Sequence, residues 1–136
     1  MKALASALLI NDTLLHLSLG DNNIGNSGAI AISDALCANS VLLSLSMGGN
    51  HRITDDGASA FLGMLQINSG LSQLNLEPST GIHPSKLGKI YDRLTRNKEA
   101  SLDFNYQVLF FLPSFPFSSS SSSSSSLSHV VCVCFV

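Results

Sequence analysis

A histidine, an aspartate and several serines lie close together near the start of the chain, and serine hydrolases combine these residue types. His16, Ser18 and Asp21 share one short segment, and a hydroxyl activated by a histidine–carboxylate pair could attack an acyl group. Such a nucleophile needs a strained G-x-S-x-G turn and a pocket that excludes water. The segment has neither pattern, so the sequence predicts no catalytic residue and no enzyme.

Metal ligands are suggested by the H-x-x-C-x-C spacing of His129, Cys132 and Cys134. A structural zinc site needs four ligands, and no fourth ligand lies nearby in this apolar run. The short glycine groups elsewhere lack the lysine of a P-loop and the fingerprint of a dinucleotide site. We therefore expect no metal, no cofactor and no small-molecule substrate.

A basic stripe gathers five of the seven positive charges on one segment. Its residues are Lys86, Lys89, Arg93, Arg96 and Lys98. The first four are spaced by three or four residues and share a helical face, opposite an apolar face of Leu87, Ile90 and Leu94. An acidic partner or a phosphate backbone could bind there, but a solvated helix face is the simpler interpretation. With a net charge of -2 and no interleaved aromatic residues, no nucleic-acid partner is expected.

A repeat of 28 to 29 residues must position all of these groups. LLHLSLGDNNIG, residues 14–25, returns as LLSLSMGGN, residues 42–50, and again from Leu71, with Ser79 in place of the asparagine. Leucines two residues apart are typical of a short strand, and the asparagine is typical of a turn whose backbone groups its amide can bind. One copy cannot bury its own leucines, so neighbouring copies must stack.

Helical spacing follows each leucine segment. The expected core positions are Ala31, Ala35, Leu36, Phe61, Leu62 and Leu65. Thr54 is expected to cap one helix and Pro84 to begin the next. The apolar start MKALASALLI could be a weak secretory signal, but it falls in the register of the repeat and is better explained as the first helix. The predicted order is helix, strand, helix, strand, helix, strand, helix.

These residues resemble the leucine-rich repeat family, and the period with a full helix looks like its ribonuclease-inhibitor subtype. The resemblance covers residues 1–100, about three and a half repeats, with a weak fourth strand at Leu102 and Phe104. It implies an α/β solenoid, a segment of a right-handed horseshoe with short parallel strands on the concave face and helices on the convex face. MLQINSGLSQLNLE, residues 64–77, is also similar to a tropomodulin repeat.

The concave face is the surface that this family would offer to a partner. Alternation along the strands assigns to it His16, Ser18, Gly20, Ser44, Ser46, Gly48, Gln73, Asn75 and Glu77. The sequence therefore predicts a non-catalytic protein-interaction module whose partner is another protein. Two alternatives stay open. In the first, these nine positions only face solvent in a fragment of a solenoid and bind no partner. In the second, the chain is a regulatory fragment of a GTPase-activating, intracellular immune-receptor or actin-capping protein.

Residues 101–136 form an apolar, serine-rich tail that is expected to be disordered. No charged residue follows Asp103, and nine consecutive serines run from Ser118 to Ser126. The apolar stretch of residues 108–117 is too short to span a membrane and is broken by two prolines. The tail is either a membrane- or partner-docking segment or a gene-model extension. Three cysteines without a disulfide framework favour a reducing compartment and a cytoplasmic location.

Overall fold

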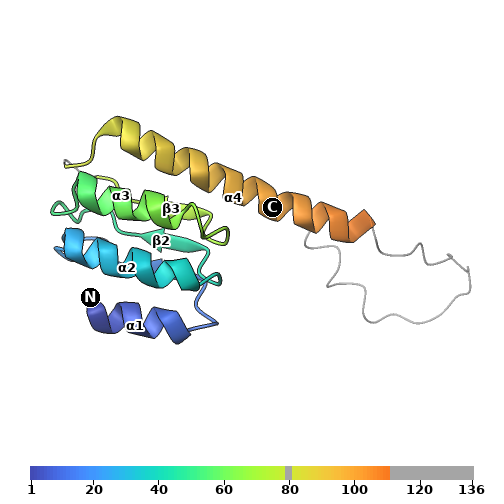
Figure 1. Ribbon diagram of the computed structural model, residues 1–136, viewed down its shortest axis with the longest axis horizontal. Coiled ribbons are helices and arrows are strands. Elements are labelled where there is room, and N and C mark those ends of the chain that lie inside the picture. The colour runs from blue at the N-terminus through green and yellow to red at the C-terminus, as the bar shows by residue number, and fades with distance from the viewer. Residues whose placement is uncertain (79–80, 111–136) are drawn as a thin grey trace, which may run out of the picture.

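Helices and strands alternate along the chain in the predicted order. The computed structural model describes residues 1–78 and 81–110. Its elements are α1 (Lys2–Ile10), β1 (His16–Ser18), α2 (Asn26–Ala38), β2 (Ser44–Ser46), α3 (Asp55–Met64), β3 (Gln73–Asn75) and α4 (Pro84–Phe110) (Figure 1). One helix and the strand that follows it make one coil, and the three coils stack side by side.

The three strands form one parallel sheet in the order β1-β2-β3. Their registers pair Leu17 with Leu45 and Leu45 with Leu74. The central leucines of the repeats therefore form one column, as the period predicts. Stacking explains the spacing, because a residue can occupy the same place in the next coil only if the period is kept.

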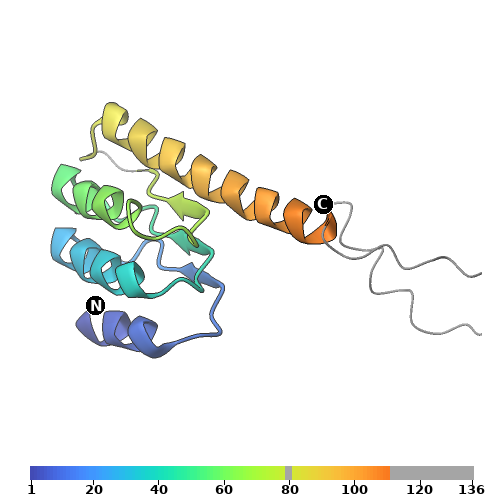
Figure 2. The same ribbon diagram turned by 45° about the vertical axis from the view of Figure 1, so that its right-hand side comes forward.

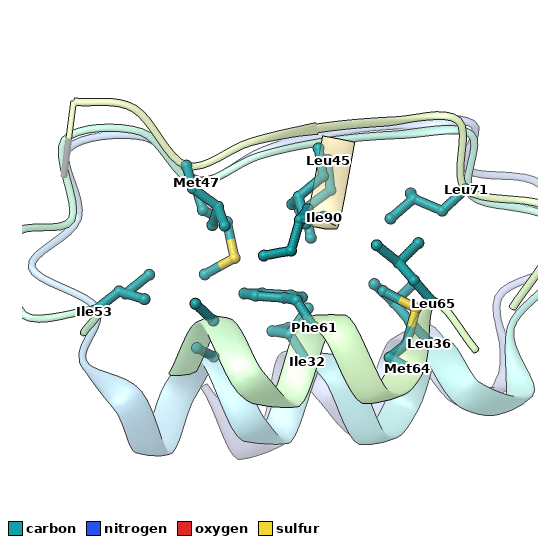
Figure 3. Packing of buried hydrophobic residues seen from close by; sticks show 14 of the residues in the cluster. Ile32, Leu36, Leu45, Met47, Ile53, Phe61, Met64, Leu65, Leu71 and Ile90 are labelled. Atoms are coloured by element: carbon teal, nitrogen blue, oxygen red, sulfur yellow. The ribbon is translucent and has the colours of Figure 1, made fainter. Parts of the chain in front are cut away.

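A layer of helices packs against one side of the sheet (Figures 1 and 2), and the core side chains lie between the two (Figure 3). Leu45 and Met47 point from the sheet toward Ile32 and Phe61 of the helices (Figure 3). Phe61 is fully buried, as predicted. The remaining predicted helix positions divide into buried Ala35, Leu36 and Leu65 and half-buried Ala31 and Leu62.

Asparagines at the helix ends join one coil to the next. The buried Asn68 donates from Nδ2 to the carbonyls of Leu36 and Asn39, both at 2.7 Å. Its Oδ1 accepts from the amides of Gly70 at 2.9 Å and Leu71 at 2.8 Å. We name three of the equivalent residues the helix-end asparagines: Asn11, Asn39 and Asn68. They satisfy backbone groups that the ends of helices leave free. The fourth equivalent, Asn97, lies within α4 and donates to the carbonyls of Asn68 at 2.9 Å and Leu71 at 2.8 Å.

The predicted role of the turn asparagine is confirmed at Asn50. Its Nδ2 donates to the carbonyls of Leu19 and Met47, both at 2.8 Å. Its Oδ1 accepts from the amides of Asn22 at 3.1 Å and Ile24 at 2.8 Å. One side chain thus fixes its own turn and the turn of the coil before it.

Thr54 occupies the N-cap position of α3, as predicted, but the capping hydrogen bonds come from another residue. The Thr54 side chain makes no capping hydrogen bond. Instead, Oδ1 of Asn26 in the previous coil accepts from the amides of Thr54 at 2.8 Å and Gly57 at 3.2 Å. The capping acceptor therefore lies 28 residues earlier in the chain, where a local capping rule does not look.

The last helix begins at Pro84 as predicted but continues to Phe110. The expected weak strand at Leu102 and Phe104 is therefore wrong, because both residues lie within α4. No glycine or proline occurs between Gly88 and Pro113 to end the helix. The sequence predicts disorder over residues 101–136. Residues 101–110 instead belong to α4, whereas residues 111–136 lie outside the described residues.

Among the described residues, α4 included, no helix is both long and apolar enough to cross a membrane.

Candidate protein-binding surface

Polar side chains in two parallel rows form the surface of the sheet that faces away from the helices. The register aligns His16, Ser44 and Gln73 in one row and Ser18, Ser46 and Asn75 in the next. We call this surface the strand face. It is defined by these six residues together with Gly20, Gly48 and Glu77, each of which lies two positions after the end of a strand. The structure thus brings the nine sequence-predicted residues onto one side of the molecule.

The accessibility of the strand face is uneven. Its exposed residues are His16, Ser18, Gln73, Asn75 and Glu77, whereas Ser44, Ser46 and Gly20 are half-buried. Gly48 is buried, so the expectation that it faces solvent does not hold. Because β2 lies between two other strands, its outward side chains are partly covered by their neighbours.

Close packing of the turns explains the two glycines of the strand face. A Cβ atom on Gly20 would lie 3.2 Å from the carbonyl oxygen of Gly48, and one on Gly48 would overlap the carbonyl oxygen of Glu77. The amide of Asp21 also donates to the carbonyl of Gly48 at 2.9 Å. These glycines let the backbones of adjacent coils approach, so they contribute shape rather than side-chain contacts.

A groove of 390 Å³ lies where α4 passes the edge of the strand face. Its polar lining consists of Ser44, Ser46, Ser72, Gln73, Asn75, Tyr91, Thr95 and Lys98. Tyr91, Thr95 and Lys98 come from α4, which extends well beyond the other helices (Figures 1 and 2). The spacing of these three residues by four and three positions places them on one helical face, and this signal was missed in the sequence.

Tyr91 has the chemistry of an interface anchor. Its ring is half-buried beside the groove. Burial raises the pKa of its phenol, and the nearby carboxylate of Glu77 raises it further. The hydroxyl is protonated at neutral pH, as it is at the ordinary tyrosine pKa of about 10, and can donate a hydrogen bond. Tyrosine is enriched among the residues that carry most of the binding energy in interfaces.

The basic stripe does not act as one surface. Lys86 donates to the Asp55 carbonyl at 3.0 Å and to Ser59 Oγ at 2.8 Å, and its ammonium lies 3.7 Å from the Asp55 carboxylate. Lys98 lies at the groove. The other members, Lys89, Arg93 and Arg96, surround a separate hollow between α3 and α4. The opposite face of Leu87, Ile90 and Leu94 is buried, as predicted.

No metal-binding cluster of three or more histidine, cysteine or acidic residues occurs in the part of the chain that the structure describes. The H-x-x-C-x-C segment with His129, Cys132 and Cys134 lies outside it.

Known proteins share this fold. The sequence model described as "Leucine Rich repeat" matches residues 11–33 and 38–62. Comparison with curated proteins finds no significant match. Among solved structures, the chain is similar to "Leiomodin-1 Actin-Binding Site 2 (ABS2)", with 21% identity, a TM-score of 0.64, and coverage of 80% of this chain and 78% of that one.

A second solved structure is the tropomodulin C-terminal domain of Caenorhabditis elegans, with 17% identity, a TM-score of 0.60 and coverage of 69% of this chain. Our chain spans 56% of the length of that domain. At these identities the likeness concerns the fold. The parallel strands, the layer of helices and the segments matched by the sequence model confirm the predicted fold class, and this likeness agrees with them. The chain therefore contains leucine-rich repeat segments and folds as an alternating helix–strand leucine-rich-repeat unit.

Proposed function

We propose that this chain is a non-catalytic protein-interaction domain and that actin is its partner. The observation that carries this proposal is the likeness of its fold, over most of its length, to a leiomodin-1 domain described as an actin-binding site. The proposal favours the actin-capping alternative over a scaffold with an unspecified partner. The fragments of a GTPase-activating protein or of an immune receptor stay predictions from the sequence.

The strand face and its groove support a role in protein binding. The groove combines hydroxyl and amide groups on its floor with a protonated tyrosine and a lysine on its wall. Asparagines hold adjacent coils together at their helix ends and turns, so little ordering is required when a partner binds. Such a surface needs neither a cofactor nor a small-molecule substrate.

The finer assignments follow the same proposal. A period of 28 to 29 residues and helices of 10 to 13 residues in the second and third coils support the ribonuclease-inhibitor subtype. An actin partner implies a cytoplasmic location, which agrees with the low number of cysteines.

The test is binding of the full chain to fluorescently labelled monomeric actin, with variants of the groove and a matched control. Truncating an anchor residue costs more than about 1 kcal/mol, so we expect Tyr91→Ala to weaken binding about fivefold or more. Gln73→Ala, on the strand face, should weaken binding measurably. Gln66→Ala, which removes the same side chain from the exposed turn after α3, should leave actin binding unchanged.

Two results would contradict the proposal in different ways. No binding of actin by the folded chain would refute actin as the partner. Binding that survives both Tyr91→Ala and Gln73→Ala would keep actin as the partner but move the contact away from the strand face.

A further inference from the structure

Charge is unevenly distributed along the chain. Residues 1–78 contain two basic and six acidic side chains, whereas residues 84–102 contain five basic and two acidic ones. A basic helix next to an otherwise acidic domain can attract a small anionic group locally, whereas the rest of the domain repels anions.

Three of these basic residues converge on one hollow of 220 Å³ between α3 and α4. Its lining consists of Lys89, Arg93 and Arg96 with Asp92, Leu62 and Gln66. The hollow lies between two helices of the layer opposite the strand face, so it is separate from the groove. We call it the basic pocket.

The cations of the basic pocket have no partner among the side chains that the structure describes. Lys86, one turn earlier, is bound to Asp55 and Ser59. In contrast, Lys89, Arg93 and Arg96 form no salt bridge with an acidic side chain in the described region, not even with Asp92. Like charges one turn apart on a helix repel each other and destabilise it. An anion bound between them would relieve this repulsion.

The net charge and the volume of the basic pocket are compatible with a phosphate group. Three cations and the Asp92 carboxylate leave two net positive charges, and a phosphate monoester carries about -1.5 to -2 at neutral pH. The planar guanidinium groups of Arg93 and Arg96 match the geometry of phosphate oxygens. Sites for whole drug-sized ligands have volumes of about 300–1,000 Å³, so a smaller pocket suits a single group.

We propose that the basic pocket binds the phosphate of a phosphorylated serine or threonine on a protein partner. A protein segment fits better than an anionic membrane, because the exposed carboxylates of Asp34 on α2 and Asp56 on α3 would repel a broad negative surface. This contact lies apart from the strand face and does not depend on the proposed binding of actin.

The test uses the full chain and a fluorescein-labelled peptide that contains one phosphoserine between uncharged residues, with the unphosphorylated peptide as reference. Fluorescence anisotropy is expected to show at least about tenfold tighter binding of the phosphorylated peptide. Arg93→Gln and Arg96→Gln should each remove most of this difference. Lys98→Gln removes the same charge from the same helix outside the basic pocket and should change the affinity less than about twofold.

A gain-of-function variant covers the case in which an arginine variant fails to fold. Asp92→Asn removes the one negative charge of the basic pocket and is expected to tighten binding of the phosphorylated peptide several-fold. Actin binding should be unaffected by Arg93→Gln and Asp92→Asn, which separates this result from the test of the strand face.

Three outcomes would overturn the proposal. The first is equal binding of the two peptides. The second is that Lys98→Gln weakens binding as much as Arg93→Gln, because the attraction would then be unspecific. The third is preferential binding to phosphatidylcholine vesicles that contain phosphatidylserine, abolished by Arg93→Gln, which would assign the basic pocket to a membrane surface.

Discussion

Replacing Asn68 by alanine tests whether the helix-end asparagines hold the coils together. The side chain is 5% exposed and makes four hydrogen bonds, two to carbonyls of the coil before it and two to amides of its own turn. Alanine would leave four backbone groups without their partners, and two of these bonds join different coils. The loss would therefore weaken the contact between coils as well as the local turn.

The expected loss follows from these four bonds. A typical intramolecular hydrogen bond contributes about 1 kcal/mol, and leaving a buried partner unsatisfied costs about 1–3 kcal/mol. We therefore expect Asn68→Ala to lower the free energy of unfolding by about 4 kcal/mol. Domains of this size are stable by only about 5–15 kcal/mol, so the variant should remain folded only marginally.

Asn11→Ala is the matched control. Asn11 is also a helix-end asparagine, but its side chain accepts only from the exposed amides of Thr13 at 3.2 Å and Leu14 at 2.7 Å. Water can replace it there, so we expect a loss below about 1 kcal/mol. Urea unfolding followed by circular dichroism measures both variants. Equal losses for Asn68→Ala and Asn11→Ala would refute the reasoning, because the contacts between coils would then contribute nothing.

Other predictions concern the core, the glycines and the groove. Leu45→Ala removes a side chain 1% exposed at the centre of the leucine column and should cost about 2–5 kcal/mol in urea unfolding. Gly49 has φ +75°, so Gly49→Ala should destabilise by about 1 kcal/mol, whereas Gly88→Ala, with open space in a helix, should stabilise by about 0.5–1 kcal/mol; thermal unfolding gives both signs. Because burial and Glu77 raise the pKa of Tyr91, its phenol absorbance should titrate above the ordinary value of about 10, and Glu77→Gln should lower the pKa without restoring that value. Because the pKa of Tyr91 is raised in the folded state, the contribution of this group to stability is present at neutral pH and is lost as the pH rises through the pKa of the folded state.

The repeat made the core predictable. Stacked coils require the same kind of side chain at the same place in each coil, so the spacing that links Leu17, Leu45 and Leu74 reports a contact directly. The role of Asn50 could be predicted for the same reason, since the exposed backbone groups of a turn recur with the period.

Features that depend on how elements cross were not predictable in the same way. The groove exists because α4 packs beside the strand face, and no local pattern near Tyr91 shows which strand residues that helix will lie against. A local rule correctly places Thr54 at the start of α3, but the side chain that accepts the capping hydrogen bonds is Asn26, 28 residues earlier in the chain. The length of α4 could have been expected from the lack of glycine and proline after Gly88.

The bonds that the helix-end asparagines make between coils have a direction, unlike those of Asn26, which reach forward to Thr54 and Gly57. The carboxamide of Asn39 reaches back to the carbonyls of Leu8 and Asn11, and that of Asn68 reaches back to Leu36 and Asn39. Each side chain therefore finds its acceptors in sequence that the ribosome has already released. The domain can close one coil at a time from its amino end during synthesis, and no coil has to wait for a residue that has not yet been made to complete this bond.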